Sequence, residues 1–406
     1  MYEFDAIQRN VRVHSGRDAL AALPDEMRRL GARRAFVVSG RSVAAGTNLV
    51  DRIRGLIGDR LVGGFHAIRK DAPASDVEAA VAAARACQAD LLLAVGAGSV
   101  IKAVRVISIL LSEAAPMRDL CTQYPEGGAP VSPKLPAAKL PIVNILTAPT
   151  SAQNRAGSAL KDDLGGARLE FFDPKTRPAS IFWDADALMT APESLIRSTG
   201  FSVYWRALMN VGTMVDANPL VQGDRSHAHR LAMRSLPRAV STAEYGARID
   251  LCAAALLQNR DEDDGGRPFD THRIARIVYA LAAPIFNRHD AVNQAEAHAA
   301  LTAATIRMHG DVCPSVVSAI GRAIVGQGDG RGQDETAMSP AVVADVVEQQ
   351  FRSLGMCVRL RDLGLETPDW GYVIAQAQRN FNADRAREFA DETERRKLEQ
   401  TLEAAW

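Results

Sequence analysis

A short apolar segment, followed by a glycine turn and then a helical pattern, constrains the fold of this chain more than any other feature. Residues 90–95 read Asp-Leu-Leu-Leu-Ala-Val, which has the length of a strand and leaves no polar face. Gly96-Ala97-Gly98-Ser99 follows, and apolar residues then recur at helical spacing from Val100 to Leu111. This order predicts a buried strand, a tight turn and a helix.

The glycine turn is a candidate phosphate site. Glycines let a ligand approach the backbone closely, and the N–H groups at the start of a helix favour an anion such as pyrophosphate. The dinucleotide fingerprint has a third glycine, whereas here Lys102 and Arg105 follow on the predicted helix. The motif alone leaves two interpretations open: a dinucleotide phosphate site and a tight turn without a ligand.

The two halves of the chain differ in periodicity. Short apolar strands alternate with helical patterns in the first half, and the strands are predicted at 11–14, 34–39, 61–65, 90–95, 142–146, 169–172 and 179–182. Long amphipathic helices follow from Pro192, among them 272–281 and 291–309 and a charged final helix from Asp384. We expect an α/β domain over residues 1–190 with a parallel sheet, an all-helical domain over 191–406, and an active-site cleft between them.

Charge and cysteine usage exclude several classes of function. Lys plus Arg and Asp plus Glu both number 48, which argues against a nucleic-acid or membrane-surface partner. The five cysteines show no CxxC spacing and are read as reduced. No run approaches the roughly eighteen apolar residues of a membrane helix, and no signal peptide is evident, so we expect a cytoplasmic protein. The acidic stretch 261–264 is read as a solvated turn in preference to a metal site.

Several strings, in their order along the chain, resemble the iron-containing (group III) alcohol dehydrogenase family, which includes the maleylacetate reductases and is related to dehydroquinate synthase. The phosphate loop of the family is similar to Gly96–Ile101, and its Pro-Thr-Thr segment is similar to Pro149-Thr150-Ser151. A segment typical of the family near the C-terminus is similar to Leu360–Gly364. The resemblance implies a Rossmann-like NAD(P)-binding domain followed by a helical domain, cofactor contacts from Gly96 to Ser99 and at Thr150 and Ser151, and a homodimer.

The resemblance also bears on which nicotinamide cofactor is used. Family members usually place an Asp after the first nucleotide-contacting strand, where it accepts a hydrogen bond from the adenosine ribose, but this chain has Ser39-Gly40-Arg41. Gly40 removes the carboxylate that would repel a 2′-phosphate, and Arg41 could pair with that phosphate. The expected cofactor is therefore NADP or NAD. The alternative for this segment is that Gly40 only makes a turn and that Arg41 is solvated.

The metal site of the family is largely absent from this sequence. The resemblance places an Asp and a His at i and i+4, where this chain has Ser202 and Arg206, and two further His where it has Ala275 and His289. Tyr279 occupies the middle position of the family's second His pattern. One imidazole and one hydroxyl do not hold a divalent ion beside an arginine, so we expect no catalytic iron or zinc.

Arg206 is the candidate replacement for the metal. A guanidinium can stabilise developing negative charge on oxygen and can bind a substrate carboxylate through two hydrogen bonds. Tyr279 or His289 would then donate the proton, and Ser202 completes the candidate set. The alternative for each residue is structural: a packed interface for Ser202 and Arg206, with Arg206 paired to an acid, and satisfied core positions for Tyr279 and His289.

We therefore expect a metal-independent, NAD(P)H-dependent oxidoreductase that reduces a carbonyl or an activated double bond of a small, carboxylated substrate, as the maleylacetate reductase branch suggests. Two alternatives stay open. One is a non-redox lyase, hydrolase or isomerase on the same scaffold, and the other is a catalytically silent homologue that binds a nucleotide.

Overall fold

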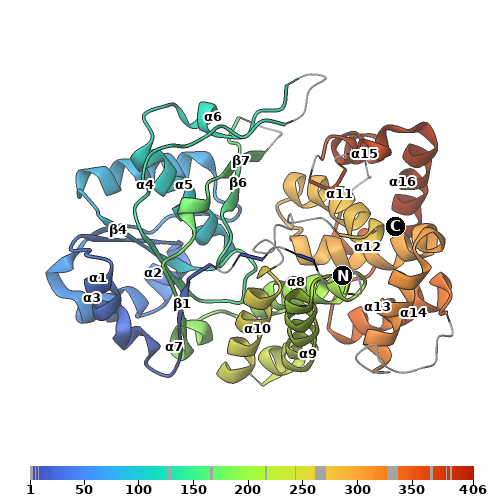
Figure 1. The fold of residues 1–406 in the computed structure, drawn as a ribbon, viewed down its shortest axis with the longest axis horizontal. Coiled ribbons are helices and arrows are strands. Elements are labelled where there is room, and N and C mark those ends of the chain that lie inside the picture. Colours follow the sequence, from blue (N-terminus) through green and yellow to red (C-terminus); the bar gives the residue numbers. More distant parts are fainter. Residues whose placement is uncertain are drawn as a thin grey trace. The chain divides into compact units, whose positions relative to one another are not determined.

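The computed structural model describes residues 3–4, 6–7, 9–125, 130–164, 168–214, 217–242, 244–260, 271–326, 337–365, 369–380, 382–384 and 386–406. These residues form two compact units (Figure 1). The α/β unit comprises Arg9–Glu193 and Thr242–Cys252, and the helical unit comprises Met1–Gln8, Ser194–Ser241 and Ala253–Trp406. The acidic stretch 261–264 lies outside the described residues.

A six-stranded parallel sheet forms the centre of the α/β unit. Its order is β1-β8-β5-β4-β2-β3. Four of its strands, β2, β4, β5 and β8, are buried along their whole length, as expected for a parallel sheet that is covered on both faces. The strands are β1 (Arg12–Gly16), β2 (Ala35–Ser39), β3 (Leu61–Phe65), β4 (Leu91–Gly96), β5 (Ile142–Leu146) and β8 (Ser180–Asp184).

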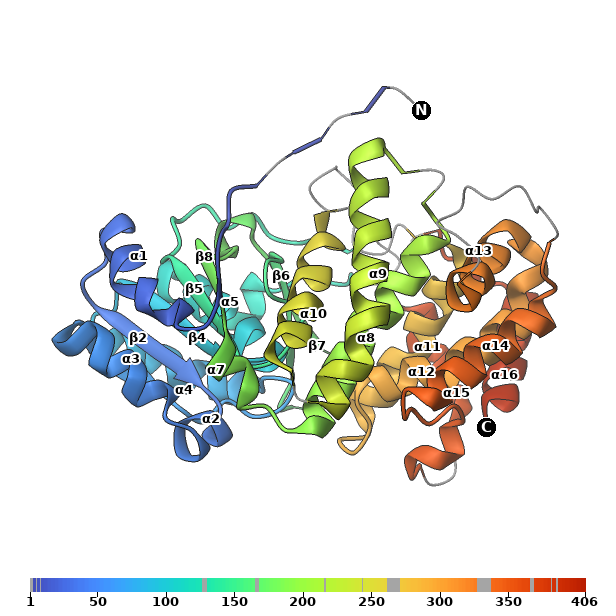
Figure 2. The same cartoon turned by 90° about the horizontal axis from the view of Figure 1, so that it is seen from below.

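Helices cover the sheet because alternate strand residues point to opposite faces. Leu91, Leu93 and Val95 of β4 join a core with α1 (Leu23–Arg29) and α3 (Leu49–Ile57). The helices α4 (Ala74–Ala86) and α5 (Gly98–Ser112) lie on the other side of the sheet (Figures 1 and 2). The unit is completed by α2 (Arg41–Gly46), α6 (Met117–Leu120), α7 (Ala185–Met189) and an antiparallel hairpin of β6 (Gly157–Lys161) and β7 (Arg168–Phe172).

The strand order brings the ends of three central strands together. β4 pairs with β2 on one side and with β5 on the other, all in parallel. The carboxyl ends of these strands therefore meet at one edge of the sheet, at the point where the direction of chain progression reverses. In open parallel sheets this is where ligands bind. The predicted strand, turn and helix at residues 90–111 are confirmed as β4, the glycine turn and α5.

The helical unit is built around α12 (Gln294–His309), which packs against α11 (Arg273–Arg288), α14 (Pro340–Ser353) and α16 (Glu392–Ala405). Twelve of the sixteen α12 residues are buried, as expected for a central helix. The remaining helices of this unit are α8 (Glu193–Val211), α9 (Pro219–Ser241), α13 (Pro314–Val325) and α15 (Trp370–Gln378). A further helix, α10 (Tyr245–Leu257), belongs to the α/β unit up to Cys252 and to the helical unit from Ala253. No helix among the described ranges is long and apolar enough to cross a membrane.

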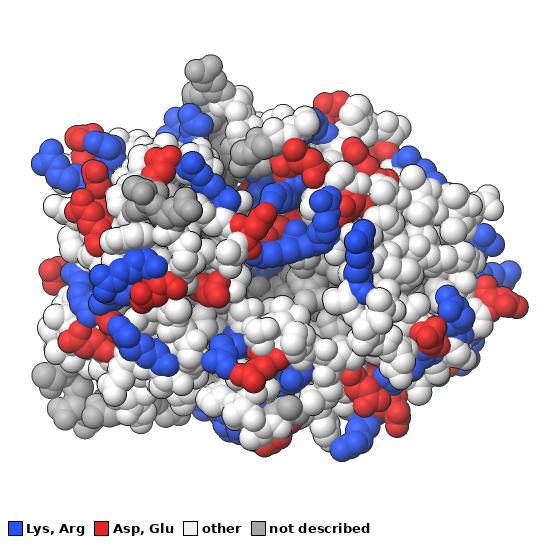
Figure 3. All heavy atoms as spheres, turned by 180° about the vertical axis from the view of Figure 1, so that it is seen from behind, with Lys and Arg blue, Asp and Glu red and all other residues white. Residues whose placement is uncertain are grey.

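Two helix boundaries differ from those expected from the sequence. α11 continues past residue 281 and through Pro284 to Arg288, because a buried apolar face outweighs the hydrogen bond that proline cannot make. The final helix begins at Glu392 and not at Asp384, since the Asp391 carboxylate accepts hydrogen bonds from the N–H groups of Thr393 and Glu394 and caps the helix there. Positive and negative side chains intermingle on the face shown in Figure 3, in line with equal numbers of the two.

Candidate functional site

The two glycines of the turn differ in what surrounds them. A Cβ on Gly96 would lie 2.8 Å from a methyl group of Val100, so the packing of α5 against β4 requires glycine there. A Cβ on Gly98 would make an ordinary contact, 3.4 Å from the hydroxyl of Thr150. Ala97, the N-cap of α5, offers no side-chain acceptor to the first N–H groups of the helix. Gly98 and the uncapped start of α5 thus form a place where a phosphate oxygen could accept hydrogen bonds.

Thr150 and Ser151 follow β5 and reach the same edge of the sheet. The Oγ1 atom of Thr150 accepts a hydrogen bond from the N–H of Ala152 (3.1 Å), which closes a tight turn beside Gly98. Two hydrogen bonds hold Gln153 next to this turn. Its backbone carbonyl accepts one from the Asn144 side chain (2.7 Å), and its side-chain oxygen accepts one from the Trp183 indole (2.9 Å). The structure therefore brings the predicted cofactor residues Gly98 and Thr150 together.

A cluster of charged side chains lies beside the first turn of α5. The backbone N–H of Asp71 donates to the Ser99 hydroxyl (3.0 Å), and both Asp71 and Ala72 have positive φ angles, 62° and 53°. The Asp71 carboxylate lies 3.9 Å from Lys102 and 3.6 Å from Arg168. Burial, together with the nearby Arg168 cation, lowers the pKa of Lys102 to about 8. Asp71 and Arg168 were not foreseen, because no local pattern links residues 71, 102 and 168.

Gly40 and Arg41 begin α2 at the end of β2. A Cβ on Gly40 would lie 3.2 Å from the carbonyl oxygen of Ile68, so the close approach of the loop after β3 favours glycine. Arg41 is exposed in the first turn of α2. Ser39, just before them, shares a hydrogen bond with His66 (2.8 Å). The position of Arg41 leaves both interpretations of this segment open, a contact to a 2′-phosphate and a solvated turn.

Arg206 and Ser202 lie one turn apart on α8 in the helical unit. The guanidinium of Arg206 donates to the amide oxygen of Asn259 (3.0 Å), a residue that is 2% exposed. The Ser202 hydroxyl donates to the carbonyl oxygen of Ser198 (3.1 Å) within the same helix. Sequence analysis missed Asn259, since only the structural alternative gave Arg206 a partner, an acid, and an amide next to a charged loop gives no distinct signal.

Tyr279 and His289 lie at different points of α11. Ten residues of one helix separate them, a rise of about 15 Å, so they cannot both serve one reacting atom. Tyr279 is half-buried, and its ring centroid is 6.3 Å from that of His298 on α12. Trp205, the neighbour of Arg206, also contacts His298, at 4.1 Å between centroids. Tyr279 and Trp205, the residue that precedes Arg206 on α8, thus share His298 as a neighbour.

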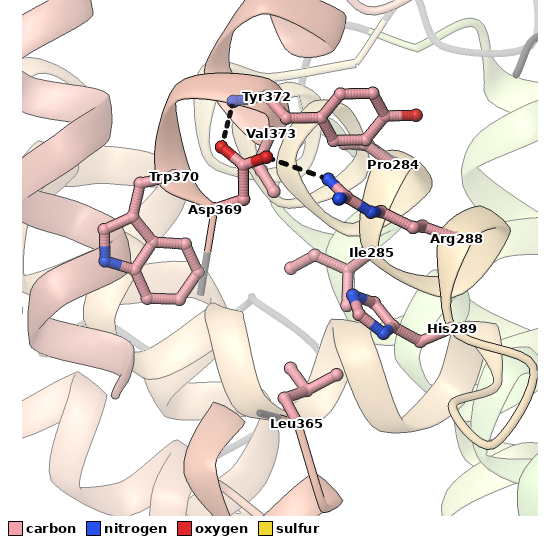
Figure 4. A pocket seen from close by; sticks show the side chains of 9 residues that line it. All are labelled: Pro284, Ile285, Arg288, His289, Leu365, Asp369, Trp370, Tyr372 and Val373. Atoms are coloured by element: carbon pink, nitrogen blue, oxygen red, sulfur yellow. Dashed lines mark hydrogen bonds and ion pairs between the residues drawn. The ribbon is translucent and has the colours of Figure 1, made fainter. Parts of the chain in front are cut away.

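His289 caps the C-terminus of α11 and lines a pocket within the helical unit (Figure 4). Arg288 donates to the Asp369 carboxylate there (3.0 Å) and lies over the Tyr372 ring, 4.6 Å from its centre. His289 points toward Leu365, below this ion pair. The full lining is Pro284, Ile285, Arg288, His289, Leu365, Asp369, Trp370, Tyr372 and Val373.

The side chains at the four metal positions do not fit a divalent ion. Ala275 has no donor atom, and α11 is continuous between it and His289, which puts the two about 21 Å apart along the helix. Ser202 and Arg206 offer a hydroxyl engaged in the helix and a cation. Within the described ranges, no three His, Cys, Asp or Glu side chains gather as a metal site requires. Whether the protein works without a metal stays a prediction.

Comparison with known proteins supports the family resemblance. Residues 10–185 match the family model described as iron-containing alcohol dehydrogenase. Maleylacetate reductase 2 of Cupriavidus pinatubonensis is 28% identical over 249 residues, which cover 61% of this chain and 60% of that protein. A maleylacetate reductase of Sphingobium indicum is 25% identical over 226 residues, which cover 56% and 54%. The chain thus spans less than two thirds of the length of these relatives.

Solved structures of low sequence identity share the fold. A 1,3-propanediol oxidoreductase superposes with a TM-score of 0.78 at 20% identity, with all of both chains covered. Maleylacetate reductase from Agrobacterium tumefaciens gives a TM-score of 0.72 at 17% identity and covers 100% of this chain and 99% of that one. The matched model over residues 10–185, the relatives and the shared fold all support the resemblance of this chain to the iron-containing alcohol dehydrogenase family.

Proposed function

We propose that the protein is an NAD(P)H-dependent reductase that acts on a carbonyl or an activated double bond of a small, carboxylated substrate without a catalytic metal. The observation that carries the proposal is the glycine turn, where Gly98 leaves room beside Thr150 at the uncapped start of α5. The maleylacetate reductases among the relatives support the substrate class.

Residues of the α/β unit would hold the cofactor. The N–H groups at the start of α5 and the hydroxyls of Ser99, Thr150 and Ser151 would bind the pyrophosphate, and Arg41 would favour a 2′-phosphate, hence NADP over NAD. When bound, the reduced nicotinamide supplies a hydride.

Residues of the helical unit would carry the other half of the reaction. Arg206, held by the neutral Asn259 amide, would bind the substrate carboxylate and stabilise negative charge on oxygen. Tyr279 would donate its phenolic proton: to oxygen when a carbonyl is reduced, or to the carbon next to the activating group when a double bond is reduced. The phenolate would then recover a proton from water. His289 is a weaker candidate because it lies about 15 Å further along α11.

A titration of metal-stripped protein with NADPH and with NADH tests the proposal. Nicotinamide fluorescence and quenching of the four tryptophans report binding. We expect saturable micromolar binding with NADPH tighter, followed by oxidation of NADPH when a keto acid is added. The variant R206A should bind NADPH as the wild type does and lose reduction.

Other outcomes of the titration point to the alternatives. Absence of binding at millimolar cofactor would contradict the reductase and leave a non-redox enzyme or a silent homologue. Reduction that appears only after Fe²⁺ or Zn²⁺ is added would contradict metal independence alone. The family resemblance also supports a cytoplasmic homodimer, which sedimentation velocity would test.

A further inference from the structure

His298 is a buried imidazole whose polar atoms make no hydrogen bond with any described residue. It lies in the first half of α12 and is 1% exposed, and neither Nδ1 nor Nε2 has a partner within the described ranges. Burial lowers the pKa of His298 to about 3, so the ring is neutral at ordinary pH. A neutral imidazole carries one N–H donor and one acceptor nitrogen.

Such an arrangement is costly in the resting protein. A buried donor or acceptor without a partner destabilises a fold, whereas an apolar side chain of the same shape does not. His309, on the same helix and 3% exposed, shows the usual solution, since its Nε2 atom is hydrogen-bonded to the Thr401 hydroxyl (3.0 Å). A polar group kept in an unfavourable setting suggests that another state of the protein uses it.

The surroundings of His298 indicate which state that is. Its ring packs on Trp205 of α8, and Trp205 is fixed because its indole N–H donates to Thr302 Oγ1 (2.8 Å), one turn further along α12. Tyr279 of α11 is a second ring neighbour of His298, in a T-shaped arrangement with 6.3 Å between the ring centroids. His298 therefore lies beside the candidate proton donor and packs on Trp205, the residue that precedes Arg206.

We propose that His298 is a positioning residue for Tyr279: in the substrate-bound protein its N–H donates a hydrogen bond to the Tyr279 phenolic oxygen. With this bond in place, the phenolic oxygen would accept a hydrogen bond from His298 and would donate its own proton to the substrate. The bond would also stabilise the phenolate that remains after transfer. The inference rests on the proposed function, since it requires Tyr279 to be the proton donor.

Four variants test the role of His298. H298F keeps an aromatic ring against Trp205 but has no N–H, H298Q restores an N–H, Y279F removes the phenol, and H309F is the matched control on the same helix. We expect H298F to melt at or above the wild-type temperature and to lower kcat at least tenfold with little change in KM for NADPH. H298Q should recover most of kcat. H309F should melt lower, because it removes the buried hydrogen bond between His309 and the Thr401 hydroxyl, which then keeps only its bond to the Lys397 carbonyl.

A double-mutant cycle separates positioning from structure. If His298 acts through Tyr279, adding H298F to Y279F should lower kcat no further. Multiplicative losses in the double variant would overturn the proposal, and so would an H298F variant that keeps full kcat or melts as low as H309F.

A measurement that needs no turnover distinguishes failure of this inference from failure of the reductase proposal. In ¹⁵N-histidine-labelled protein, NADP⁺ plus malonate should shift the His298 ring nitrogens in the wild type and not in Y279F. Shifts in a protein that reduces nothing would support His298 and contradict the reductase. Unchanged His298 signals with both probes bound would overturn the positioning role even if reduction is observed.

Discussion

Lys102 illustrates at the scale of one residue how a functional charge can weaken a fold. It lies near the start of α5 and forms an ion pair with Asp71, while the nearby Arg168, which pairs with the same carboxylate, repels the charge of Lys102. The folded state therefore disfavours protonated Lys102 relative to the unfolded chain. A cation kept in this setting, next to a candidate phosphate site, is expected to contribute to anion binding.

The variant K102M should be more stable than the wild type at pH 7, by on the order of 3 kcal/mol, and should bind NADPH more weakly. The pKa of Lys102 is about 8 in the folded protein against about 10.5 unfolded, so the unfolded chain binds more protons between these values. Wild-type stability should thus rise from pH 8 to pH 10.5, and the advantage of K102M should fade over the same interval. Urea denaturation at pH 7 and pH 10 measures both.

The exposed Lys134 provides the control, because K134M should change neither stability nor NADPH affinity. A K102M protein that is less stable than the wild type at pH 7 would mean that the attraction of Asp71 outweighs burial.

At the scale of an element, the two glycines between β4 and α5 have different roles. Gly96 is required by packing, as its missing Cβ leaves space for Val100. Gly98 has room for a methyl group, and neither glycine has a positive φ, so alanine is conformationally allowed at both positions. The sequence pattern presents them as equivalent, whereas the structure separates a structural glycine from one that keeps space for a ligand.

We predict opposite phenotypes for the two alanine variants. G96A should lose about 1–3 kcal/mol of stability, because the added methyl group pushes the first turn of α5 away from β4. The second change V100A should restore much of that loss. G98A should melt within about 1 °C of the wild type and bind NADPH at least tenfold more weakly, as measured by fluorescence titration. Full NADPH affinity in G98A would show that the turn does not contact the cofactor.

At the scale of the whole molecule, the two units do not correspond to two continuous stretches of the chain. The α/β unit takes up Thr242–Cys252, a segment that follows two long helices of the other unit. Arg248, 3% exposed, donates to the carbonyls of Leu188 (2.5 Å) and Ala191 (3.1 Å), and the buried amide of Gln153 donates to the carbonyl of Cys252 (2.8 Å). The segment thus satisfies polar groups that lie far from it in sequence.

A fragment of residues 1–193 should therefore be unstable by itself. Without residues 242–252, the Gln153 amide loses a buried hydrogen bond, at a cost of about 1–3 kcal/mol, and the two carbonyls lose theirs. Attaching residues 242–257 through a flexible Gly-Ser linker of about 20 residues should raise the urea midpoint, whereas a scrambled segment should not. Equal midpoints for all three fragments would show that the α/β unit is complete at residue 193.

The sequence by itself determined the elements and their succession, because strands, turns and helices depend on the residue types found two to four positions apart. The strand before Gly96, the helix after it, the alternation that requires a parallel sheet and the change to helices near residue 190 were all visible in this way. The family resemblance likewise rests on local strings, and two residues that it implies as cofactor contacts, Gly98 and Thr150, lie next to each other in the structure.

Only the tertiary structure decided which polar groups share a space. Three contacts join residues tens of positions apart: the Asp71 carboxylate with Lys102 and Arg168, the Asn259 amide with Arg206, and the ring of His298 with Trp205 and Tyr279. No periodicity connects such positions. They meet because the burial of apolar faces sets the order of the strands and the packing of the helices, and the polar side chains are brought together as a consequence.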